Sequence, residues 1–103
     1  MENLHPYSLQ ASILRYRGEV ALHSAMCIEA AERGQDDNLP ITFRKSMEVL
    51  ESWDRPAADI VEAVMALELA VEDYEMGDTD RIPSMMKAAL GWISAEQKRR
   101  ASK

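Results

Sequence analysis

The sequence has 103 residues, 47% of them hydrophobic and 29% charged, which suits one folded domain and excludes the disordered and fibrous classes. Its formal net charge of −6 argues against nucleic acid or an anionic membrane surface as a partner, because the whole molecule repels both. No stretch approaches the roughly 18 apolar residues of a membrane helix, and the single cysteine, Cys27, cannot form an internal disulfide. We therefore expect one domain over residues 1–103, in the cytoplasm, with 1–7 and 101–103 as frayed termini.

The first predicted helix spans residues 8–33, with Pro6 before it and Gly34 as its terminator. Its apolar positions recur at alternating steps of four and three residues, the spacing of a helix packed nearly parallel to its neighbours. This seam consists of Leu9, Ile13, Tyr16, Val20, His23, Cys27 and Ala30. Small residues beside the seam, Gly18 among them, would let another backbone approach closely.

The second predicted helix spans 40–53, because Pro40 suits a first turn and Pro56 pushes the residue before it out of helical geometry. The third spans 56–76, is acidic along its length, and has two apolar faces. The face that we expect in the core consists of Ile60, Val64, Leu67, Val71 and Tyr74. The second face consists of Val61, Met65, Leu69 and Met76. A helix that is apolar on two sides is either central or has a partner.

The fourth predicted helix spans 80–100, after the helix terminator Gly77 and with Pro83 near its start. Its apolar stripe consists of Ile82, Met86, Ala89, Leu90 and Ile93. Short connections between four helices predict an all-α fold, an antiparallel four-helix bundle. Assembly of this bundle as a dimer is left open.

One cluster has the residue types of a metal site. Glu19, His23 and Cys27 are spaced four apart along one side of the first helix, and all three side chains can bind zinc or iron. However, His23 and Cys27 fall on the packing seam, where a hydrogen-bonded histidine and an inert thiol are common. We therefore expect core residues and predict no metal ligand. A metal-binding bundle around His23 and Cys27, completed by a symmetric dimer, is the least favoured alternative.

Other chemistry-bearing groups also have simpler interpretations. Glu68, Glu72 and Glu75 share one side of the third helix and are expected to form a solvated acidic face. The sequence has no glycine-rich phosphate loop, nucleophile elbow or paired cysteines. We therefore predict no catalytic residue, no cofactor and no enzyme activity.

The last helix ends in a basic cluster that consists of Lys98, Arg99, Arg100 and Lys103. A nucleic-acid-associated regulator that uses this cluster is the alternative function, and its binding would weaken steeply with salt. Cations at a helix C-terminus are already explained by the helix dipole, and the chain is acidic overall. Nucleic acid is therefore not the partner that we expect.

Seven methionines are more than one small core needs, and methionine suits surfaces that accept differing partners. The candidate protein-interaction residues are Trp53, Val61, Met65, Leu69, Met76, Met85, Met86 and Trp92. The sequence therefore predicts a protein-interaction module, working as an adaptor, chaperone-like or regulatory protein. It would form a homo-oligomer or dock a partner helix. In layout this resembles small export chaperones and adaptors, although no motif is matched.

Overall fold

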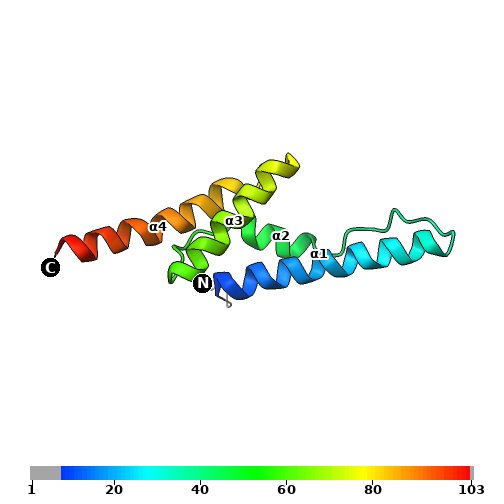
Figure 1. Ribbon diagram of the computed structural model, residues 1–103, viewed down its shortest axis with the longest axis horizontal. Coiled ribbons are helices and arrows are strands. Elements are labelled where there is room, and N and C mark those ends of the chain that lie inside the picture. The colour runs from blue at the N-terminus through cyan, green and yellow to red at the C-terminus, as the bar shows by residue number, and fades with distance from the viewer. Residues whose placement is uncertain (1–7, 103) are drawn as a thin grey trace.

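The computed structural model describes residues 8–102, which form four helices and no strand (Figure 1). These are α1 (Leu9–Glu32), α2 (Arg44–Glu51), α3 (Ile60–Met76) and α4 (Ile82–Ala101). The prediction of an all-α four-helix bundle is confirmed. The prediction that residues 1–7 fray lies outside the described residues, as does its part for Lys103, whereas Ala101 still belongs to α4.

The helices pack as two layers, α1 with α2 and α3 with α4. Because α1 also packs on α3 and α2 on α4, the order around the bundle is α1, α2, α4, α3. The neighbours α1 and α3 run parallel: the Gln10 amide meets Glu62 near the start of both helices, and Arg17 meets Glu72 further along both. The layer of α3 and α4 therefore has one side on α1 and α2 and one side away from them.

A single buried carboxylate stabilises the start of two helices. Glu62 accepts hydrogen bonds from the backbone amides of Gln10, in the first turn of α1, at 3.0 Å and of Ala58 at 2.9 Å. Asp59 caps α3 by accepting from the Glu62 amide at 2.9 Å. The first amides of a helix have no partner within it and carry the positive end of its dipole, so a carboxylate is well placed there.

The predicted bounds of α2 and α3 were too wide. Residues 40–43 are not helical, because this segment lies along α1, where the Leu39 carbonyl contacts His23 and the Phe43 ring packs edge-on against His23. Residues 56–59 are also outside a helix: α3 begins only after its cap Asp59, and the Ala57 amide donates to the Ala88 carbonyl of α4 at 2.9 Å. In both places the segment before the helix packs on a neighbouring helix, and the helix begins later than the sequence predicts.

The core lies between the two layers and is built largely from small residues. Its buried apolar members are Leu9, Ile13, Leu50, Trp53, Ala57, Ala63, Ala66, Leu69, Ala70, Met85, Ala88 and Ala89. The alanines of α3 and α4 let these two helices approach closely, which makes them the most closely packed pair in the bundle.

The molecule is elongated, with principal extents of 64 × 33 × 19 Å. Its radius of gyration is 16.5 Å, whereas a compact chain of this length has about 13 Å. The second half of α1 and the last turns of α4 project in opposite directions from the central packing (Figure 1). The predicted seam of α1 is consequently only half-buried at Val20, His23 and Cys27, because α2 has only eight residues.

Candidate protein-interaction surface

The most apolar exposed surface runs along α3. It consists of Ile60, Val64, Leu67, Val71 and Tyr74, whose side chains are between 39% and 76% exposed. The sequence-based prediction placed this stripe in the core and is wrong. The core instead takes the side of α3 that carries Ala63, Ala66, Leu69 and Ala70. The reason is steric, since only the side with small residues allows α4 to pack so close.

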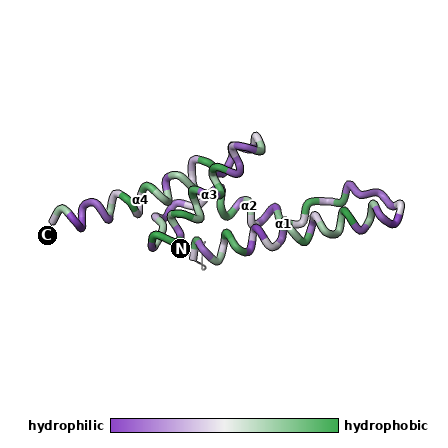
Figure 2. Tube along the Cα trace, in the orientation of Figure 1, coloured by the Kyte–Doolittle hydropathy of each residue, from purple (hydrophilic) through white to green (hydrophobic). Residues whose placement is uncertain are grey.

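The neighbouring helix α4 has an exposed apolar stripe of its own. Met86 and Leu90 are exposed, and Ile93 beside them is half-buried. The opposite side of α4 carries the buried residues Met85 and Ala88. Both helices of this layer therefore have more apolar side chains than they bury. Hydrophobic residues recur along α3 and along the first part of α4 (Figure 2).

Helix geometry places the two exposed stripes next to each other. Around α3, at about 100° per residue, the side chains that reach α1 come first, then the buried alanines, then the stripe of Val64 and Val71. Around α4 the same order holds: Ser84, which donates to the Leu50 carbonyl of α2, then Met85, then Met86 and Leu90.

Both stripes therefore lie on the side of the layer that faces away from α1 and α2. We call this surface the outer face, and it consists of Ile60, Val64, Leu67, Val71, Tyr74, Met86 and Leu90. A shallow hollow on it is lined by Val64, Leu67 and Val71, with Glu68 and Glu72 at its edge. An apolar surface of this kind, formed by two adjacent helices, is typical of an association site.

The outer face has edges of opposite charge. Glu68 and Glu75 flank the stripe on α3, and Lys87 flanks the stripe on α4. All three side chains are exposed, and none of them forms an ion pair within residues 8–102. The surface therefore has an acidic edge on α3 and a basic edge on α4.

The structure separates the residues that the sequence suggested as one interaction surface. Trp53, Leu69 and Met85 are buried, so their predicted exposure is wrong, and Met65 and Trp92 are half-buried against the core. Three others, Val61, Met76 and Met86, are exposed. Only Met86 belongs to the outer face, because Val61 lies beyond the acidic edge and Met76 lies at the end of α3.

A second, narrower apolar surface lies on the outside of α1. It consists of Leu14, Gly18, Ala21, Leu22, Ala25 and Ile28, all of them exposed. We call it the α1 stripe. Three of its members, Gly18, Ala21 and Ala25, are small, so it has fewer large apolar side chains than the outer face.

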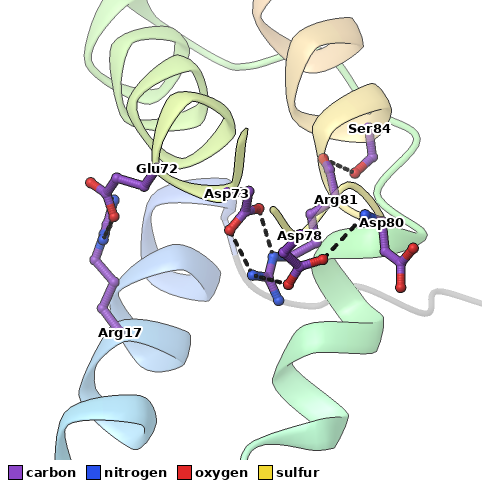
Figure 3. A network of polar contacts seen from close by, with 7 residues as sticks. All are labelled: Arg17, Glu72, Asp73, Asp78, Asp80, Arg81 and Ser84. Carbon is purple, nitrogen blue, oxygen red and sulfur yellow. Dashed lines mark hydrogen bonds and ion pairs between the residues drawn. The ribbon is translucent and has the colours of Figure 1, made fainter. Parts of the chain in front are cut away.

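A buried arginine joins α1 to the layer of α3 and α4 (Figure 3). Arg81, whose side chain is 2% exposed, donates to Asp73 at 3.0 and 2.7 Å and to Asp78 at 3.2 Å. Its guanidinium lies 4.4 Å from the ring centroid of Tyr16, whose pKa is raised by burial. Nothing in the sequence singled out Arg81, because its only signal was its place just after Asp78 and Asp80 near a helix start.

A second ion pair lies beside the buried arginine and joins the same helices. Arg17 of α1 donates to both carboxylate oxygens of Glu72, at 2.7 and 3.0 Å, which lowers the Glu72 pKa and raises that of Arg17 (Figure 3). Glu72 is thus held in an ion pair, whereas Glu68 and Glu75 form none within residues 8–102. All three glutamates are exposed on one side of α3, as the sequence predicted for a solvated acidic face.

The candidate metal ligands have other partners. His23 donates from Nε2 to the Leu39 carbonyl at 3.2 Å, and Cys27 Sγ lies 3.8 Å from the same nitrogen. Glu19 accepts from Ser46, which lowers its pKa, and pairs with Arg15. Residues 8–102 contain no group of three or more acidic, histidine or cysteine side chains placed to hold a metal ion.

The basic end of α4 is partly neutralised within its own helix. Arg99 and Arg100 both pair with Glu96, whose pKa is lowered by these hydrogen bonds. Lys103, the last member of the predicted cluster, lies outside the described residues. This pairing weakens the case for a nucleic-acid interface at the end of α4.

Within residues 8–102, no helix combines the length and the apolarity that crossing a bilayer requires. The exposed apolar residues lie on one side of amphipathic helices rather than around them. Comparison with protein-family models, curated proteins and solved structures finds no match for this chain.

Proposed function

We propose that the protein is a non-enzymatic protein-interaction module that binds another polypeptide chain on the outer face of α3 and α4. The observation that carries this proposal is the gathering of seven large, exposed apolar side chains on one side of one layer. Leaving such a surface in water is unfavourable, by roughly 25 cal/mol for each Å² of apolar area. A bound protein would remove this cost.

The polar side chains support a role without catalysis. Glu19, Glu72 and Asp73 each have a hydroxyl or cationic partner that fixes one helix on another. These contacts hold the two layers together and thereby keep the outer face in place. We place this activity in the cytoplasm, because the lone cysteine gives the fold no need of an oxidising compartment.

The proposal is tested by photo-crosslinking in the native cells. A photoreactive residue at Val64, in the hollow of the outer face, is expected to give a discrete covalent adduct with a second polypeptide. The control position is Glu48, exposed on α2 in the other layer, which is expected to give none. Equal labelling at both positions, or no adduct at Val64, contradicts the proposal.

A further inference from the structure

We infer that the chain on the outer face is a second copy of this protein, packed so that α3 of each copy lies on α4 of the other. This inference rests on the proposed function and names its partner. In a two-fold dimer of this kind, the dyad lies between the outer faces and runs along the helices. The four helices at the interface would form a bundle of their own, with an apolar centre.

The charges at the edges of the outer face favour this arrangement. A dyad along the helices exchanges the two edges, so the acidic edge of one copy meets the basic edge of the other. Lys87 lies within about two helical turns of both Glu68 and Glu75 along the layer, since Arg81 at the start of α4 bonds Asp73 and the two helices run antiparallel. Each Lys87 would therefore face the acidic edge of the second copy.

The alternative two-fold arrangement is unfavourable. A dyad across the helices would place α3 on α3, and the acidic edges would then meet each other. Like charges brought together at an interface disfavour association. The outer face is thus complementary to itself in one of its two face-to-face orientations.

The length of the apolar stripe suits a helical interface. Ile60 and Tyr74 stand at opposite ends of α3, about 21 Å apart at 1.5 Å per residue. Met86 and Leu90 widen the stripe onto a second helix. Large side chains repeating along two adjacent helices are what a four-helix packing uses at its centre.

The first test is sedimentation equilibrium of the purified protein and two matched variants. Val71→Glu places a charge on the outer face and Leu14→Glu places one on the α1 stripe, at side chains that are 56% and 54% exposed. We expect a wild-type dimer whose dissociation constant rises at least about 100-fold in Val71→Glu, because burying an unpaired charge is costly. Leu14→Glu is expected to leave the dissociation constant unchanged.

Circular dichroism of each variant checks that the helices remain. If Val71→Glu does not fold, Tyr74→Lys serves in its place, because Tyr74 is the most exposed member of the outer face. A dimer that Leu14→Glu dissociates and Val71→Glu does not would overturn the inference in favour of the α1 stripe.

The second test is a charge exchange that reports the orientation. Glu75→Lys and Lys87→Glu are each expected to weaken the dimer about three- to tenfold at low salt, and the double variant to recover the wild-type constant. With α3 on α3, Glu75→Lys would tighten the dimer, because it relieves repulsion between acidic edges. Tightening by Glu75→Lys, or no recovery in the double variant, would overturn the inference.

The two proposals fail in different ways. A wild-type protein that stays monomeric up to about millimolar concentration overturns the second-copy inference alone, provided that Val64 still crosslinks to a different protein in cells. An absence of any adduct at Val64, together with a monomer in solution, overturns both.

Discussion

Arg81 shows how much of the fold depends on one side chain that carries a full charge into the interior. Its guanidinium bonds Asp73, which is itself buried, and stacks on Tyr16, so it connects α3, the start of α4 and α1. Burial by itself disfavours the charged form, but the hydrogen bonds to Asp73, together with the charge interactions with Tyr16, Asp73 and Asp78, outweigh this and raise the Arg81 pKa. The Arg81 guanidinium therefore stays charged at neutral pH.

Removing this arginine is expected to be costly. Arg81→Met leaves the Asp73 carboxylate buried without its partner, which should lower the free energy of unfolding by roughly 3–5 kcal/mol. Urea denaturation monitored by circular dichroism measures the change. The matched control is Arg33→Met, which breaks the exposed pair with Glu29 and should cost less than about 1 kcal/mol. Equal effects of the two substitutions would contradict the role given to Arg81.

Substitution of two glycines by alanine is expected to change the stability of the fold in opposite directions. A Cβ at Gly91 would lie 2.8 Å from Cβ of Pro56, whose ring cannot swing away, whereas a Cβ at Gly18 meets nothing within 4 Å. Gly91→Ala should therefore destabilise the fold by about 1–3 kcal/mol, and Gly18→Ala should stabilise α1 by up to about 1 kcal/mol. Thermal and urea denaturation of both variants check the prediction, which fails if the two substitutions shift stability in the same direction.

Acid should weaken the contact between α1 and α3. Hydrogen bonds from Arg17 lower the Glu72 pKa below its ordinary value of 4.5. The stabilisation that this ion pair gives to the fold is therefore complete above about pH 4.5. It is lost as the pH falls through the lower pKa that Glu72 has in the folded protein. Because the pair is exposed, its contribution should stay below about 1 kcal/mol.

Glu72→Gln tests this pH dependence. The variant should be less stable than the wild type at pH 7 and equally stable at pH 2, when measured by urea denaturation at both pH values. Glu29→Gln is the control, since its carboxylate makes only an exposed pair within α1. A stability difference between wild type and Glu72→Gln that is unchanged at low pH would contradict the role of this ion pair.

At the scale of elements, the sequence predicted where helices end but did not predict which face of a helix is buried. Gly34 and Gly77 have positive φ angles of 73° and 80° where the sequence placed the ends of α1 and α3. The ends of helices depend on local backbone geometry, which residue type reveals. The start of α2 depended on the contact of residues 39–43 with α1, which no local pattern contains.

The two apolar faces of α3 show why the interaction surface could not be predicted. The large aliphatic residues lie mostly on the exposed side, whereas the buried side has Leu69 among alanines, so hydrophobic periodicity favours the wrong side for the core. What decides between them is the set of small residues at Ala63, Ala66 and Ala70, which allows α4 to approach. The spacing of these alanines is visible in the sequence, but it predicts the buried side only when the helix that packs there is known.

Two substitutions within one turn of α3, on different sides of the helix, test this assignment of faces. Leu69→Glu, at a fully buried position, should abolish the cooperative fold, whereas Val71→Glu should keep the helix content and the unfolding transition of a folded monomer. Circular dichroism and thermal denaturation of both variants measure the difference. If Leu69→Glu folds and Val71→Glu does not, the core and outer faces of α3 have been exchanged.

At the scale of the whole molecule, the elongated shape and the outer face have a common explanation. Small bundles bury a modest share of their surface, and this one leaves both its projecting helix ends and the outer side of a layer in water. A second copy on the outer face would give α3 and α4 apolar contacts on both sides. The dimer, rather than the single chain, would then be the unit in which α3 is central.

The most direct test of the dimer is an isotope-filtered NOE experiment on a mixture of carbon-13-labelled and unlabelled protein. This experiment detects only contacts between copies. We predict intermolecular NOEs from the methyl groups of Val64, Leu67 and Val71 on α3 to those of Met86 and Leu90 on α4. Intermolecular NOEs confined to α1, or found only between residues of α3, would contradict the arrangement in which α3 of each copy packs on α4 of the other.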